Sequence, residues 1–165
     1  MSFRISPRRS TKMKKILLIS LLCFLVVGAF AAVVYFGKGK GAIRVGDHHI
    51  GLFRFEVYKS EDQVKGSARF EILNKDKQVL MVIGVPKVVK VQFTNHSAEF
   101  QGKGIMRKGT EERPVLVHIF AADAKDSTEY KDKFAIKCFD ASGNVVFSAG
   151  GIVQHGDIII GKRED

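Results

Sequence analysis

Apolar residues recur at every second position over most of residues 50–160, and this alternation constrains the fold more than any other feature. A period of two is typical of a β-strand with one buried face, whereas an amphipathic helix needs a period near 3.6. The segments that share the alternation are Phe53–Val57, Ala68–Ile72, Val89–Phe93, Ala98–Phe100, Val115–Ile119 and Phe134–Cys138. No segment in this region has a convincing helical pattern, so we expect an all-β domain.

Turn signals separate these segments at short intervals. Asp140–Asn144 combines Asp, Ser, Gly and Asn, which bond their own backbone or accept a positive φ, and His155-Gly156-Asp157 is a second turn. Val79–Val85 is continuously apolar, as in a buried strand, and Val115–Phe120 is apolar enough to be covered on both faces. The pattern predicts roughly eight to ten short strands over residues 49–162, arranged as an antiparallel β-sandwich or barrel.

The positive charge is concentrated in the N-terminal segment. The formal net charge is +10, and residues 1–40 hold eight Lys or Arg and no acid, so the remainder carries only +2. A nucleic-acid-binding domain needs a basic stripe on its folded surface. The β domain shows no such stripe, and we expect no nucleic-acid partner.

Residues 16–36 are 21 consecutive uncharged, mostly apolar residues behind a basic block at residues 1–15. A bilayer span needs about 20 apolar residues and a signal peptide about 7–15, and this run fits both. Ala29-Phe30-Ala31 is a signal-peptidase type of site, and Met13 is an alternative start to Met1. The run continues past Ala31 and more basic residues precede it than follow it, which slightly favours retention as an anchor.

Either outcome predicts an extracytoplasmic domain, attached to the membrane by one N-terminal hydrophobic helix or secreted after cleavage near Ala31. The segment Gly37–His48 begins with glycines and lysines, which discourage packing, and is interpreted as a flexible linker. The β domain then occupies residues 49–162.

Residue types that carry chemistry are scattered. Cys138 is the one cysteine outside residues 16–36, so the β domain has no internal disulfide, and its apolar phase indicates a core thiol. A zinc site needs three or four converging ligands. His48 and His49 are adjacent and would point to opposite faces of a strand, and the other histidines stand singly at His96, His118 and His155.

Four acids, Asp123, Asp126, Glu129 and Asp132, fall in one loop, as calcium ligands often do. Their spacing is not that of a helix–loop–helix calcium site, and three nearby lysines offset their charge, so a solvated loop is favoured. Ser97, Ser127, Ser142 and Ser148 lack a nucleophile-elbow context. The sequence therefore predicts no catalytic, cofactor-binding or metal-binding residues.

Residues 64–162 contain a recognisable series of short motifs: Gly66–Phe70, Ala98–Gly104, Asp132–Asp140, Gly143–Phe147, Gly150-Gly151 and Gly156–Ile160. The series resembles a small β domain of bacterial secreted and surface proteins, which often lies beside anchor modules. Phe139 stands where that family frequently has Trp. The resemblance implies an extracytoplasmic all-β domain and carries over no catalytic residue.

The sequence thus favours a non-catalytic, exported or membrane-tethered β domain with a role in envelope structure or in binding a surface protein or glycan. Two alternatives stay open. A small exported hydrolase requires carboxylates or histidines that converge in a cleft, and a carrier of hydrophobic ligands requires an apolar cavity of several hundred Å³.

Overall fold

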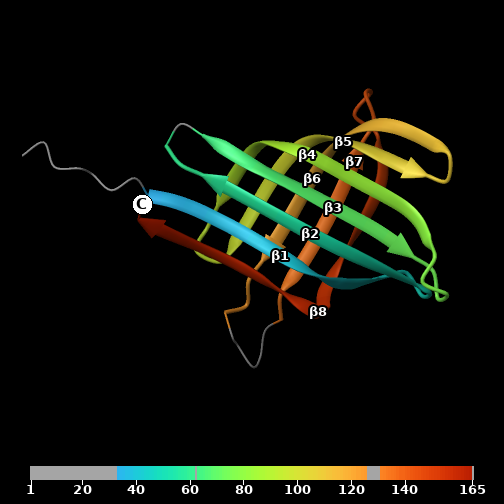
Figure 1. The fold of residues 1–165 in the computed structure, drawn as a ribbon, viewed down its shortest axis with the longest axis horizontal. Coiled ribbons are helices and arrows are strands. Elements are labelled where there is room, and N and C mark those ends of the chain that lie inside the picture. Colours follow the sequence, from blue (N-terminus) through green and yellow to red (C-terminus); the bar gives the residue numbers. More distant parts are fainter. Residues whose placement is uncertain (1–32, 62, 126–130, 165) are drawn as a thin grey trace, which may run out of the picture. The chain divides into compact units, whose positions relative to one another are not determined.

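The computed structural model describes residues 33–61, 63–125 and 131–164, and these residues form eight antiparallel β-strands. Each strand pairs with the next along the chain, and the last pairs with the first, which closes a barrel (Figure 1). The strands are β1 (Val33–Val45), β2 (His49–Lys59), β3 (Val64–Leu73), β4 (Val79–Phe93), β5 (Ser97–Lys108), β6 (Glu111–Ala122), β7 (Lys133–Phe139) and β8 (Val145–Glu164).

The predicted all-β, antiparallel class is confirmed, and of the two predicted architectures the structure has the barrel. Several strands are longer than expected, since β4 joins two predicted strands, and β8, with 20 residues, continues through the predicted turn at His155-Gly156-Asp157, which is therefore wrong. The predicted N-terminal helix over residues 16–36 lies outside the described residues as far as residue 32, and over residues 33–36 it is wrong, because these residues begin strand β1. No helix within the described part of the chain has the length and hydropathy of a membrane span.

The predicted linker over residues 37–48 is wrong for most of its length, because residues 33–45 form strand β1. Three glycines, Gly37, Gly39 and Gly41, lie on its inner face. A Cβ on Gly39 would come within 2.7 Å of the Phe55 ring, and one on Gly41 within 2.9 Å of the Phe53 ring. The glycines therefore provide the space that the aromatic side chains of β2 occupy, while the lysines between them face solvent.

Closure of the barrel depends on β8. Its second half pairs with β1 from Val33↔Glu164 to Ile43↔Val153, with a bulge near Ala42. The start of β1 and the end of β8 therefore lie side by side at one end of the barrel (Figure 1). Full closure leaves no unpaired edge strand, which removes a common route to aggregation.

Phenylalanine rings fill the middle of the barrel. Phe53 stacks on Phe134 with ring centroids 4.2 Å apart, and Phe70 lies 5.9 Å from the same ring. Phe55 and Phe100 continue the cluster at 5.3 Å. All of these side chains are buried, so the central section is a packed core and not a channel.

Two acids of the predicted solvated loop bond the backbone of β8. The Asp132 carboxylate accepts hydrogen bonds from the backbone N–H groups of Ala124 and Ile158, at 2.8 and 2.7 Å. Asp123 accepts one from Ile160 N–H at 3.0 Å. Ile158 and Ile160 lie in the part of β8 that no longer pairs with β7, so their N–H groups have no partner in that strand. The two carboxylates accept hydrogen bonds from these N–H groups and so hold this part of β8 in place. Asp126 and Glu129 lie outside the described residues.

Candidate functional site

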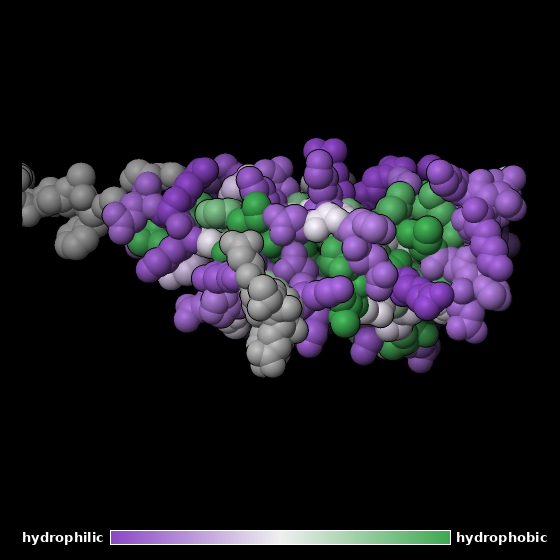
Figure 2. Space-filling view, turned by 90° about the horizontal axis from the view of Figure 1, so that it is seen from below, coloured by the Kyte–Doolittle hydropathy of each residue, from purple (hydrophilic) through white to green (hydrophobic). Residues whose placement is uncertain are grey.

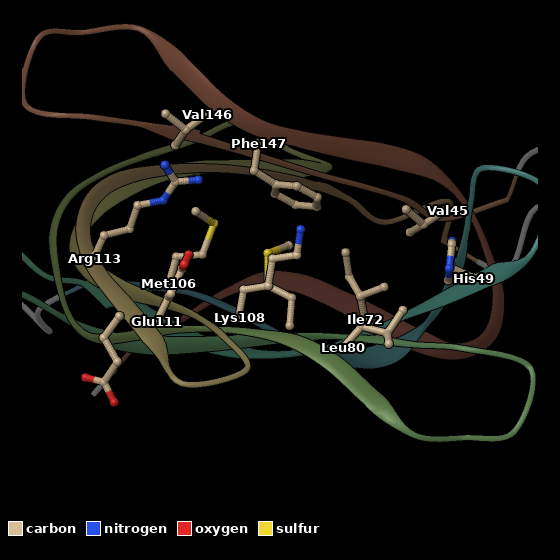
Figure 3. A pocket seen from close by; sticks show the side chains of 12 residues that line it. Val45, His49, Ile72, Leu80, Met106, Lys108, Glu111, Arg113, Val146 and Phe147 are labelled. Carbon is tan, nitrogen blue, oxygen red and sulfur yellow. The ribbon is translucent and has the colours of Figure 1, made fainter.

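The barrel has a hollow at the end opposite its two described termini. Four hairpins meet there, those that join β1 to β2, β3 to β4, β5 to β6 and β7 to β8. The cavity between them has a volume of about 660 Å³ and opens to solvent (Figure 3). Its apolar lining comprises Val45, Ile72, Leu80, Met81, Met106, Val146 and Phe147, and its polar lining comprises His49, Lys108, Glu111, Glu112 and Arg113.

The strand period explains why charged side chains stand over an apolar floor. On β5, Gly104, Met106 and Lys108 share the inner face, and on β6 Arg113 is in phase with buried Val115. The inward-facing positions of both strands therefore continue from the core to the open end of the barrel. At that end, these positions are occupied by Lys108 and Arg113. In Figure 3 the Lys108 ammonium group extends toward Phe147, and the Arg113 guanidinium extends toward Val146.

Some of the charged side chains around the cavity form ion pairs and others do not. Arg107, on the outer face of β5, binds Glu112 with its Nε 2.6 Å from Oε1. Among the described residues, neither Lys108 nor Arg113 forms an ion pair with a carboxylate. The backbone N–H of Asn144 is the main cause that lowers the pKa of Asp140, and the charge of Arg113 adds a smaller effect in the same direction.

The histidines do not converge on one point. His49 lines the cavity and also borders an adjoining hollow that includes His48 and His155, whereas His96 lies in the turn between β4 and β5. His118 packs on Phe139 outside the barrel, with ring centroids 4.9 Å apart. Within residues 33–61, 63–125 and 131–164, no three His, Cys, Asp or Glu side chains are grouped so that they could hold a metal ion.

Cys138 is fully buried in β7, as its apolar phase predicts. Burial raises the pKa of its thiol from 9.0 to about 12, against a smaller opposing effect of Arg113. The thiolate, which is the reactive form, is therefore much rarer at neutral pH than in a free cysteine.

We expect Cys138 in the native protein to resist iodoacetamide at mildly alkaline pH, because its thiol is both protonated and inaccessible. In guanidinium chloride the same residue should alkylate at the rate of a free cysteine. Peptide mapping by mass spectrometry reads residue 138 separately from Cys23. Equal rates in the native and denatured states would contradict the burial of this side chain.

The outer surface is mostly polar, with separate apolar patches between the charged side chains (Figure 2). The expectation that Val115–Phe120 is covered on both faces is wrong. Leu116 and Phe120 point outward and are 38% and 39% exposed, while Val115, Val117 and Ile119 are buried. The described part of the chain has nothing that covers this outer stripe of β6.

Sequence reasoning did not single out any residue of the cavity as part of a site. The one available signal was the in-phase extension of the β5 and β6 alternation into Lys108 and Arg113. This signal indicates a binding site only once the structure shows that the two strands lie across the barrel opening from Phe147. Comparisons with protein-family models, with curated proteins and with solved structures gave no match.

Proposed function

We propose that this protein is a non-catalytic, exported binding domain that takes a small amphipathic molecule in the open end of its barrel. The observation that carries the proposal is the cavity of about 660 Å³ with an apolar floor and a charged rim. Ligand sites in proteins typically have volumes of about 300–1,000 Å³, apolar walls and a few polar groups. Of the three hypotheses drawn from the sequence, the proposal combines binding with the ligand carrier.

The arrangement of polar groups favours binding over hydrolysis. A general acid–base pair needs its two groups within reach of one reacting bond. Figure 3 places His49 at the opposite end of the cavity from Arg113 and the β5–β6 hairpin. Glu112 is engaged by Arg107 on the outer face. The packed phenylalanines below the cavity leave no deeper space, so the ligand occupies the opening and not the whole barrel.

Methionine methyl groups provide a direct test, because Met81 and Met106 line the cavity. We expect their NMR signals to shift saturably when octanol or octanoate is added to the full chain. Leu80→Trp, which fills the opening, should weaken this binding by about tenfold or more. Val89→Trp is the matched control, since Val89 is an exposed residue of the same strand that does not line the cavity. Methionine methyl signals that do not shift on addition of any amphiphile would refute the proposed function.

Export is the second part of the proposal, and it rests on the basic segment followed by the uncharged run of residues 16–36. Strand β1 begins at Val33, two residues after the candidate cleavage site at Ala31. Cleavage there would remove residues 16–31 of the run and leave the described barrel complete. The apolar residues beyond Ala31 therefore have an explanation as part of β1, so they no longer favour retention.

The location is tested in bacterial cells that express the full chain. Protease added to intact spheroplasts should digest the β domain, and intact-mass measurement should give a chain that begins at Ala32 if the run is cleaved. If the run is retained as an anchor, the intact mass should be that of the full chain, and the protease should still digest the β domain. Complete protection from protease and recovery in the cytosolic fraction would contradict export.

A further inference from the structure

We propose that the ligand of the end cavity is a single-chain amphiphile with an anionic head group, such as a carboxylate, held between Lys108 and Arg113. This inference rests on the proposed function and adds the chemical class of the ligand. It requires that the two cations be available, that they lie on the same side of the opening, and that an apolar surface lies within the length of a short tail.

The two cations meet the first two requirements. Lys108 ends β5, and Arg113 lies near the start of β6, opposite Met106 in the β-ladder. Both residues therefore belong to one hairpin and project from its inner face. Neither forms an ion pair with another described residue, although Arg113 is close enough to Asp140 for its charge to act on that carboxylate. A lysine and an arginine together can donate several charge-assisted hydrogen bonds to one anion.

Glu111 is the acidic group that argues against an anion. It lies directly opposite Lys108 in the ladder and lines the same cavity. The second acid of the lining, Glu112, has its charge compensated by Arg107. The lining groups without an ion pair are then two cations and one carboxylate, so the lining itself keeps an excess of one positive charge to attract an anion. Asp140, which is outside the lining, offsets part of the charge of Arg113.

The apolar floor meets the third requirement. Met106 is buried directly across the ladder from Arg113, and Ile72 and Met81 continue the floor from neighbouring strands β3 and β4. Phe147 closes the opposite wall. The depth ends at the packed phenylalanine cluster, so the tail must be short, and a flexible chain fits between methionine side chains that adapt their shape.

The test compares head groups on one tail. Full-length protein in lipid nanodiscs, with methyl-labelled methionine, is titrated with octanoate, octanol, octyltrimethylammonium and acetate. We expect octanoate to bind about tenfold or more tightly than octanol, and octyltrimethylammonium and acetate to cause no saturable shift at Met81 or Met106. Acetate distinguishes an amphiphile site from a site for free anions.

Variants assign the preference to the two cations. Lys108→Gln with Arg113→Gln should abolish the preference for octanoate over octanol. Lys103→Gln with Lys137→Gln removes the same charge from the outer face and should change neither affinity. Saturable binding with equal affinity for octanoate and octanol would overturn the anionic head group while the proposed function stands. A saturable shift with acetate equal to the shift with octanoate would contradict the proposal that the ligand needs an apolar tail.

Discussion

Deletion of residues 156–165 is expected to give insoluble or unfolded protein. The deletion removes Ile158 and Ile160, which are 1% and 4% exposed, and it removes the β8 partners of β1 from Val33 to Gly41. Full burial of one isoleucine contributes about 1.5–3 kcal/mol, and the whole stability of a domain is about 5–15 kcal/mol. The Asp132 and Asp123 carboxylates would also lose the backbone donors of Ile158 and Ile160, and β1 would become an exposed edge.

The matched control is deletion of Lys162–Asp165 only. This shorter deletion affects the pairing of β1 only at Tyr35, Val34 and Val33, which are the last pairs at the end of the barrel, and it should be tolerated. Solubility and thermal unfolding followed by circular dichroism distinguish the two chains. A soluble 156–165 deletion that melts cooperatively at the native temperature would contradict the closure of the barrel by β8.

Phe134→Ala is expected to lower the free energy of unfolding by about 3–5 kcal/mol. Phe134 is 2% exposed, and its ring contacts Phe53, Phe55 and Phe70 at centroid distances of 4.2, 6.2 and 5.9 Å. These neighbours come from two other strands whose backbones are fixed in the barrel, so they cannot collapse into the space left by the ring. The cavity therefore adds its cost to the lost transfer free energy.

Phe120→Ala removes the same side chain from the outer face, where Phe120 is 39% exposed, and should cost less than about 1 kcal/mol. Denaturant unfolding of the two variants measures both values. Equal losses for the two residues would show that the stacked cluster does not form the core. Should Phe134→Ala fail to fold, Phe134→Leu keeps most of the volume and should be destabilised by a smaller amount.

Most of the fold could be predicted from the alternation of apolar and polar residues. Phe53–Val57 and Phe134–Cys138 have the predicted inward faces, and the Asp140–Asn144 turn has the expected hydrogen bonds, since Asp140 accepts from the backbone of Ser142 and Asn144 at 2.9 Å each. Strand β1 was missed because its inner face is glycine from Gly37 to Gly41, and glycine carries no hydropathy signal. Its role depends on the rings of β2 that pack against it, and a single strand contains no information about them.

The cavity could not be predicted for a similar reason. Its lining comes from seven of the eight strands, and residues as distant as Val45 and Phe147 share it. The alternation places Met106 and Arg113 on inward faces. Whether an inward-facing residue lies in the packed core or lines an opening depends on how far its strand extends past the phenylalanine cluster. The acids of the 123–132 loop illustrate the same limit, because the donors that they bond lie 26 and 37 residues further along the chain.

The sequence by itself determined the all-β class, the inward faces of segments such as Phe53–Val57 and Phe134–Cys138, and the burial of Cys138, because these depend on the pleat of a single strand. In the Val89–Phe93 segment the predicted phase is wrong at Val89, which is exposed because the register shifts between Val88 and Lys90. Tertiary structure alone decided that the sheet closes, that the Gly37–Gly41 segment is a strand, and that Lys108 and Arg113 stand over an apolar floor. Closure depends on pairing between β1 and β8, more than a hundred residues apart in the chain. Long-range pairing of this kind is stabilised by the assembled core, and no local pattern of residues specifies it.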